Sequence, residues 1–237
     1  MLRRPAAMAF APGAYVFPGG SVDAADGDPG IGWPGGGAGP GPEELGEWLG
    51  TSPGQARALA CAAVRETFEE SGVLLARRRD GPDGALPGSR DASLADDRTA
   101  LAAGRVTFAD VLARRGLVID AGLLTPWARW ITPEAEPRRF DTFFFAAALP
   151  AGQRAVGDHA EAEQIAWVRP AAAIAAARSG EMLLLPPTAT TLGEFAASGD
   201  VDAILATRRA IAPVEPRLVL EDGTAWLLIP DETGYPL

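Results

Sequence analysis

One nine-residue stretch, RETFEESGV at positions 65–73, constrains this chain more than any other. Its three glutamates, Glu66, Glu69 and Glu70, have the relative spacing i, i+3 and i+4, which places them on one face of a helix. We expect this helix to begin near Arg57 and to end at Gly72, because glycine tolerates the left-handed backbone that ends many helices. Smaller and apolar residues fall on the opposite face, which we expect to pack against a sheet: Ala60, Val64, Phe68 and Ser71.

Three carboxylates on one helix face repel one another, at a cost of roughly 0.2–0.5 kcal/mol per pair. A divalent cation removes this cost, and hard oxygen ligands suit Mg²⁺ or Mn²⁺. The glutamates therefore indicate either a metal site or, as the plainer alternative, an acidic face in contact with solvent. Arg65 lies four residues before Glu69, so a salt bridge could orient that carboxylate.

The motif resembles the second half of the Nudix box, which reads Arg-Glu-U-x-Glu-Glu-x-Gly-U, where U is a bulky apolar residue. Thr67 is a mild departure at the first U position. Upstream, the sequence VFPGG at positions 16–20 resembles the strand and glycine pair that begin the same box. By this resemblance, Gly19 and Gly20 are expected to bind substrate.

The first half of the box departs from the common pattern. A Gly/Pro-rich insertion at about residues 21–56 separates Gly20 from the helix, and Arg57 occupies the place of the box's first Glu. Four other acids could replace that Glu, and the sequence does not choose among them: Asp23, Asp26, Glu43 and Glu44. The insertion, with FPGG-x-VD-x-x-D before it, resembles a Nudix subgroup that includes a peroxisomal coenzyme A diphosphatase of animals.

The resemblance implies an α/β fold, the Nudix α/β/α sandwich with a mixed sheet between helices. It also implies hydrolysis of a diphosphate that joins a nucleoside to another group. Glu66, Glu69 and Glu70 would hold one to three Mg²⁺ or Mn²⁺ ions, Glu70 being essential for turnover, and Arg65 would fix Glu69 in place.

Two further sets of residues are candidates for the site. Glu163 or Glu161, just before a Trp-Val pair, would be the general base by the same resemblance. Arg138 and Arg139 precede an apolar strand, where a guanidinium could bind a substrate phosphate through paired hydrogen bonds. Alternatively, the two arginines only balance nearby glutamates, and the acids belong to an exposed acidic loop.

Composition excludes several classes of protein. The net charge of −10 disfavours non-specific binding to nucleic acid or to anionic membranes. No apolar run approaches the roughly 20 residues that span a bilayer. The single cysteine, Cys61, fits a reducing cytoplasm, and its place among alanines favours packing over catalysis. A small-molecule diphosphate is the expected partner, whereas the oligomeric state is left open, a homodimer included.

We expect one domain over residues 1–237, with an exposed, mobile loop at about 77–100. Only Met1 and Leu2 precede Arg3, where the resembling subgroup has a strand, so we expect an incomplete strand there. Periodicity and turn residues predict helices at 43–49, 107–115, 170–178, 186–195 and 201–210, strands at 123–133, 138–149 and 182–185, and a hairpin at 217–229.

Three functions remain compatible with the sequence. The first is a diphosphatase for coenzyme A or its acyl esters, and the second is a Nudix enzyme for ADP-ribose or a dinucleotide. The third is a Nudix-fold binding module without activity, which the split box keeps open and the intact glutamates disfavour.

Overall fold

The computed structural model describes residues 1–8, 11–33, 39–79, 92–156, 164–221 and 224–230. The helices are η1 (Ala24–Gly27), α1 (Pro42–Leu49), α2 (Pro53–Ser71), α3 (Ala92–Ala102), α4 (Phe108–Arg114), η2 (Ala121–Leu123), α5 (Pro170–Arg178), α6 (Pro186–Ser198) and α7 (Val201–Ala206). The strands are β1 (Leu2–Arg3), β2 (Tyr15–Val16), β3 (Ala76–Arg78), β4 (Leu117–Ile119), β5 (Thr125–Ile131), β6 (Asp141–Ala146), β7 (Gln164–Ile165), β8 (Pro213–Val214), β9 (Arg217–Glu221) and β10 (Thr224–Leu228). This mixture confirms the α/β class.

The glutamate-bearing helix is α2, and it is longer than predicted. It begins at Pro53 rather than near Arg57, because the Ser52 hydroxyl caps it by accepting a hydrogen bond from the Gln55 N–H at 3.2 Å. Proline at the first helical position suits that start. The helix ends as predicted at Gly72, which has a left-handed backbone with φ of 71°.

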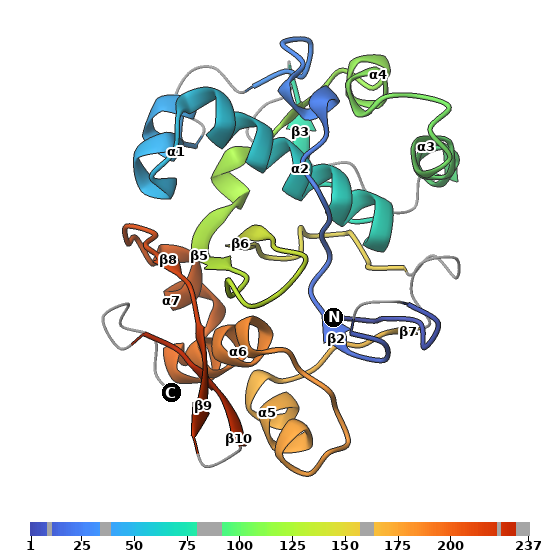
Figure 1. The fold of residues 1–237 in the computed structure, drawn as a ribbon. Coiled ribbons are helices and arrows are strands. Elements are labelled where there is room, and N and C mark those ends of the chain that lie inside the picture. The colour runs from blue at the N-terminus through green and yellow to red at the C-terminus, as the bar shows by residue number, and fades with distance from the viewer. Residues whose placement is uncertain (9–10, 34–38, 80–91, 157–163, 222–223, 231–237) are drawn as a thin grey trace.

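A mixed sheet lies in the middle of the molecule. Strand β5 pairs antiparallel with β6 and parallel with β8. The other described strands form smaller sheets, β2-β1-β7, β3-β4 and β9-β10. Figure 1 shows α1 and α2 above β5 and β6, with α5, α6, α7 and the β9-β10 hairpin below them. The predicted arrangement of helices on both sides of a mixed sheet is confirmed, although its strands are divided among short sheets.

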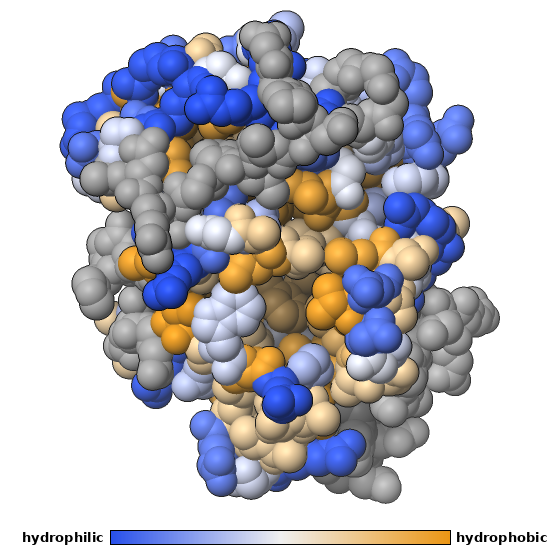
Figure 2. Space-filling view, turned by 180° about the vertical axis from the view of Figure 1, so that it is seen from behind, coloured by the Kyte–Doolittle hydropathy of each residue, from blue (hydrophilic) through white to orange (hydrophobic). Residues whose placement is uncertain are grey.

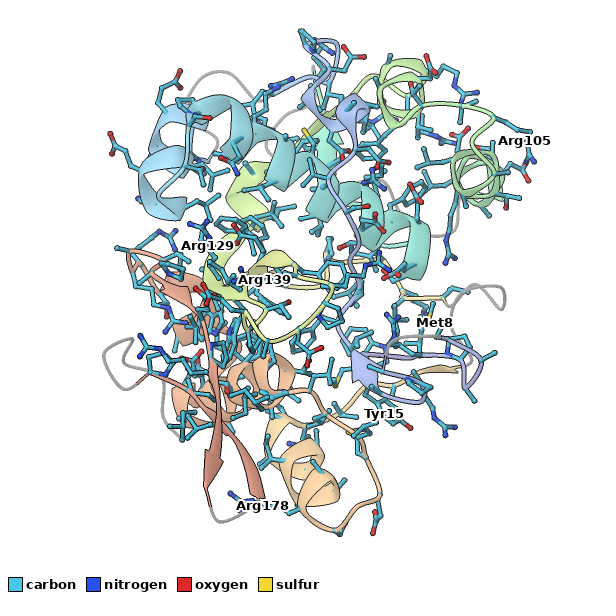
Figure 3. All side chains as sticks on the ribbon, in the orientation of Figure 1. Met8, Tyr15, Arg105, Arg129, Arg139 and Arg178 are labelled. Carbon is cyan, nitrogen blue, oxygen red and sulfur yellow. The ribbon has the colours of Figure 1, made fainter. Side chains whose placement is uncertain are left out.

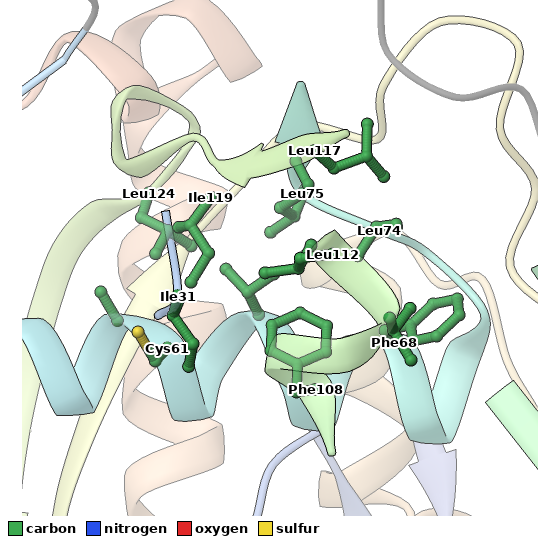
Figure 4. Close-up of a cluster of buried hydrophobic side chains, with 14 of the residues drawn as sticks. Ile31, Cys61, Phe68, Leu74, Leu75, Phe108, Leu112, Leu117, Ile119 and Leu124 are labelled. Carbon is green, nitrogen blue, oxygen red and sulfur yellow. The ribbon is translucent and has the colours of Figure 1, made fainter. Parts of the chain in front are cut away.

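The main core forms around the apolar face of α2, as its spacing predicted. Phe68 and Cys61 on this face pack with Phe108 and Leu112 of α4 and with Ile31 of the insertion (Figure 4). A second, smaller cluster of buried residues forms around strand β5: Trp127, Ala128, Trp130, Ala146 and Val214. Burying these side chains contributes about 1.5–3 kcal/mol for each large one, and it holds the opposite face of α2 toward the segment that follows β2.

Several predicted elements need correction. Residues 92–102 form helix α3 rather than continuing the loop expected at 77–100, because Leu94 and Leu101, seven residues apart, bury one face. Residues 80–91 lie outside the described part. The strand expected at 182–185 is reduced to a single bridge between Leu184 and Tyr15. Strand β6 begins at Asp141, three residues after the predicted start, and α7 ends at Ala206.

The first residues form strand β1, which lies between β2 and β7. The surface also carries exposed apolar side chains, among them Trp167 and Leu183. Figure 2 shows apolar residues gathered around a hollow on the face opposite to that of Figure 1. Among the described helices, none has the length and hydropathy needed to cross a bilayer.

Candidate active site

The three glutamates lie along the last two turns of α2, on the side away from the core. Phe68, between them in sequence, is fully buried, whereas all three glutamates are half-buried. The helix therefore separates an apolar face from an acidic face, as the spacing predicted. The acidic face meets the segment after β2, which passes in front of α2 in Figure 1.

The two glycines after β2 close onto this acidic face. The Gly19 N–H donates a hydrogen bond to Glu70 Oε2 at 2.8 Å. A Cβ atom on Gly20 would lie 2.7 Å from Glu66 Oε2, so only glycine fits there without moving the carboxylate. The two parts of the motif, 45 or more residues apart in sequence, thus form one site.

Arg65 holds this site together from a buried position. Its Nη1 donates to Glu66 Oε1 at 2.9 Å and more weakly to Glu69 Oε1 at 3.4 Å. Its Nε and Nη2 bind both carboxylate oxygens of Asp26, at 2.9 and 3.0 Å, and Nη2 also donates to the Ser21 carbonyl. The predicted contact with Glu69 is present, but Asp26 is the stronger partner.

Burial and charge shift the protonation of this cluster. Burial raises the pKa of Glu66 above its usual range, Asp23 and Asp26 add to the rise, and the Arg65 guanidinium opposes it. For Arg65 itself, burial acts to lower the pKa, but hydrogen bonds and charge from Asp26 and Glu66 raise it above the usual value. Burial therefore disfavours the charged form of Glu66 by more than the Arg65 guanidinium offsets.

The donor set fits a hard divalent cation. Glu66, Glu69 and Glu70 offer carboxylate oxygens, and the Glu66 carboxylate lies directly against the Gly20 backbone. Within the described residues, no three acidic, His or Cys side chains are already gathered around one point where an ion could bind. Two of the carboxylates are turned toward Arg65 and the third toward Gly19, so binding an ion requires rotation of these side chains.

The candidate phosphate-binding arginines lie apart from the glutamates. Arg139, beside β5 and β6 in Figure 3, donates to the Thr132 carbonyl and pairs with Glu215. Arg138 is exposed, and its guanidinium lies 5.0 Å from the centre of the Phe140 ring. In the described part of the chain, neither arginine contacts the glutamate cluster directly. The alternative expected Arg138 and Arg139 to balance the nearby Glu134 and Glu136, but the partner of Arg139 is Glu215.

The candidate bases Glu163 and Glu161 lie outside the described residues. The residues before them are tied to the C-terminal end of α2, because the Val156 N–H donates to the Ser71 carbonyl at 2.7 Å. Arg98 of α3 strengthens this connection by donating to the carbonyls of Glu69 and Val156. Sequence reasoning missed Arg98 because its segment was interpreted as a loop.

Arg57 stands where the Nudix box has its first Glu, and it has a different role. Its Nη2 donates to the carbonyls of Asp28 and Ile31, and its guanidinium lies 5.5 Å from the centre of the Trp33 ring. Arg57 therefore fastens the insertion to α2. Cys61, one turn further on, is fully buried, and burial raises the pKa of its thiol to about 12, which confirms a packing role.

Comparison with known proteins agrees with this geometry. A sequence profile of the NUDT19 Nudix domain matches residues 45–194, more than half of the chain. The chain belongs to the Nudix family. Human "Acyl-coenzyme A diphosphatase NUDT19" is 33% identical over 98% of this chain and 71% of its own length. The chicken protein of the same name is 32% identical over 78% of this chain and 57% of its own length.

Further Nudix proteins extend the comparison. "Putative nudix hydrolase 7" of Caenorhabditis elegans is 28% identical over 85% of this chain and 57% of its own length. The crystal structure of a Nudix hydrolase from Alicyclobacillus acidocaldarius superimposes with a TM-score of 0.62, at 29% identity, and covers 89% of this chain and 88% of the other. The predictions of a Nudix fold, a Nudix hydrolase and the insertion-bearing subgroup are confirmed.

Proposed function

We propose that this Nudix hydrolase cleaves the diphosphate of coenzyme A or of acyl-coenzyme A. The similarity to acyl-coenzyme A diphosphatases of human and chicken supports this substrate class. One structural observation carries the assignment to diphosphate chemistry. Gly19 and Gly20 close onto Glu70 and Glu66, so that the acidic face of α2 and an exposed backbone turn share one site.

The residues of this site have different roles in the proposed reaction. Glu66, Glu69 and Glu70 would hold Mg²⁺ or Mn²⁺, and the bound ion would supply charge neutralisation for the diphosphate and a water of lowered pKa. Arg65 orients Glu66 and Glu69 through Nη1. Divalent cations are a general requirement of Nudix hydrolases, whereas the choice between Mg²⁺ and Mn²⁺ is part of this proposal.

The general base is Glu163 or, failing that, Glu161. The residues on both sides of this acidic segment are tied to elements of the site. Val156 is bonded to Ser71 at the end of α2, and β7 pairs with β1, next to the strand that leads to the glycines.

Arg138 and Arg139 bind a phosphate of the substrate in this proposal. Arg138 is the better candidate, because it is exposed and rests on the Phe140 ring, whereas Arg139 must first leave Glu215. The substrate is a small molecule, with no part for nucleic acid. A location in the cytoplasm, a single domain over residues 1–237 and an undetermined oligomeric state, which includes a homodimer, remain predictions from sequence.

The proposal is tested by incubating the protein with a panel of diphosphates and identifying the products by mass spectrometry. Coenzyme A, acetyl-coenzyme A, ADP-ribose and a dinucleoside diphosphate are each supplied with Mg²⁺ and, separately, with Mn²⁺. Release of phosphopantetheine or its acyl form supports the proposal. Preferred cleavage of ADP-ribose or the dinucleotide overturns the substrate assignment, and no cleavage of any compound indicates a binding module.

The substitution Glu70→Gln tests the metal assignment. Glutamine keeps an oxygen that can accept the Gly19 N–H, so the fold is retained, but it removes a charged ligand. We expect kcat to fall by about 10²-fold or more, since removing a group that only supports a metal ligand already costs about 10- to 100-fold. Glu47→Gln, an exposed charge on α1, is the matched control. Full activity of Glu70→Gln at saturating Mg²⁺ would exclude Glu70 as a ligand.

A further inference from the structure

One buried acid lies outside the glutamate motif and touches its arginine. Asp26, in the short helix η1 of the insertion, is only 1% exposed. Both of its carboxylate oxygens bind Arg65, and Oδ2 also accepts the Asp23 N–H at 2.8 Å. A buried carboxylate is costly unless it is paired and hydrogen-bonded. Asp26 satisfies this condition through Arg65 and its own turn.

The nitrogens of the Arg65 guanidinium bind different partners. Asp26 occupies the side formed by Nε and Nη2, and only Nη1 is directed to Glu66 and Glu69. If Asp26 were neutral, the guanidinium would be free to turn and bind the glutamates through two nitrogens, as arginine does with carboxylates. The same glutamate oxygens would then be less accessible to a cation.

We propose that Asp26 is a positioning residue of the active site. It holds Arg65 so that Glu66 and Glu69 are oriented but remain able to bind a divalent cation. This inference rests on the proposed function only in assigning the cation to those glutamates. It gives the insertion a part in catalysis, because Asp26 reaches Arg65 from 39 residues away in sequence.

A second connection fixes the position of Asp26. Arg57, two helical turns before Arg65, binds the carbonyls of Asp28 and Ile31, and Ile31 is buried in the main core. The residues on the C-terminal side of Asp26 are thereby fastened to the same helix that carries the glutamates. The Ser21 carbonyl, on its N-terminal side, accepts from Arg65 Nη2 at 2.9 Å. The backbone on both sides of Asp26 is therefore held against α2.

A purely structural role for Asp26 makes a different prediction from a positioning role. A buried ion pair that only stabilises the insertion would change the unfolding temperature and leave the metal affinity of the folded protein unchanged. A positioning role changes metal affinity and kcat in protein that remains folded. Measurements on folded variants, with Mn²⁺ alone as the ligand, therefore separate the two roles.

The experiment compares Asp26→Asn with Asp28→Asn. Both remove one negative charge from the insertion, but Asp28 is exposed and caps only its own turn through the Gly30 N–H. Mn²⁺ affinity is measured by electron paramagnetic resonance, and kcat and KM by the coenzyme A assay. We expect Asp26→Asn to bind Mn²⁺ about 10- to 100-fold more weakly and to lose kcat by a similar factor. We expect KM to change by less than about threefold, and Asp28→Asn to match the wild type.

Equal Mn²⁺ affinity of folded Asp26→Asn and Asp28→Asn would overturn the inference. If the wild type cleaves none of the diphosphates but Asp26→Asn alone loses Mn²⁺ affinity, the positioning role stands and the proposed function fails. If Asp26→Asn does not unfold cooperatively, Asp26→Glu replaces it, since the charge is kept and the carboxylate is moved by one methylene. We expect weaker Mn²⁺ binding and lower kcat from that shift, and wild-type values would overturn the inference.

Discussion

At the level of single residues, the Glu66 carboxylate packs against Gly20 in the space that a larger side chain would fill. A methyl group on Gly20 would overlap the Glu66 carboxylate, which is the flexible end of a side chain and can move away. We therefore expect Gly20→Ala to change the free energy of unfolding by less than about 1 kcal/mol. We expect kcat to fall by about 100-fold, because a ligand displaced by about 1 Å is enough for such a loss.

Urea unfolding and steady-state kinetics measure the two effects of Gly20→Ala. Gly27→Ala, in the same insertion with open space around the added carbon, is the control that should retain activity. If Gly20→Ala had the kcat of the wild type, catalysis would not depend on the present position of the Glu66 carboxylate.

The raised pKa of Glu66 predicts a pH dependence of stability. Burial raises this pKa, so the folded protein binds the proton more tightly than the unfolded chain does. The contribution of Glu66 to stability is therefore complete below the ordinary glutamate pKa of about 4.3, and it is lost as pH rises through the folded value. Glutamine does not titrate, so the Glu66→Gln variant should not lose stability in this way as pH rises.

Thermal unfolding in EDTA across a pH series checks this expectation. The unfolding temperature of the wild type should fall relative to that of Glu66→Gln as pH rises above the ordinary glutamate range. Curves that stay parallel, or that separate in the opposite direction, would contradict a raised pKa.

At the scale of elements, helix α2 and the insertion act as a unit. Arg57 supplies the donors for two insertion carbonyls at the position where the Nudix box has its first Glu. Restoring the usual residue with Arg57→Glu would put a carboxylate against those carbonyls. We expect a loss of about 1.5–3 kcal/mol of stability, the value of hydrogen bonds from a charged donor, with no gain in kcat.

Urea unfolding and the coenzyme A assay test Arg57→Glu, with Arg57→Lys as the control that keeps the charge. A variant that is more active than the wild type would show that the first Glu of the box is missing from this chain rather than replaced by Asp26.

At the scale of the whole molecule, a net charge of −10 makes divalent cations favourable ligands. A cation that binds only the folded state stabilises it by about 2.7 kcal/mol at 100 times its Kd. For a domain of this size we expect the unfolding temperature to rise by roughly 5–10 °C in millimolar Mn²⁺. Scanning calorimetry measures this rise in unfolding temperature. We expect Mn²⁺ to raise it less in Glu69→Gln than in the wild type, and by the wild-type amount in Glu47→Gln. An equal rise in both variants would show that the cation binds elsewhere.

Local pattern was sufficient for much of this protein. The spacing of Glu66, Glu69 and Glu70 and the apolar stripe opposite them depend only on helical geometry, so both could be predicted. Pattern failed at α3, where two buried leucines seven residues apart give a weak signal, and at the start of α2, where the Ser52 cap was overlooked.

The family and the acidic face of α2 could be inferred without a structure, because a compact motif encodes both within a few residues. Which acid pairs most closely with Arg65 depends on the three-dimensional fold. Asp23, Asp26, Glu43 and Glu44 all lie in the insertion, and nothing in the sequence separates them; in the fold Asp23 Oδ2 lies 3.7 Å from Arg65, whereas Asp26 binds it through both oxygens. Burial selects Asp26, because a buried carboxylate must be paired and hydrogen-bonded, and Arg65 binds both oxygens of Asp26.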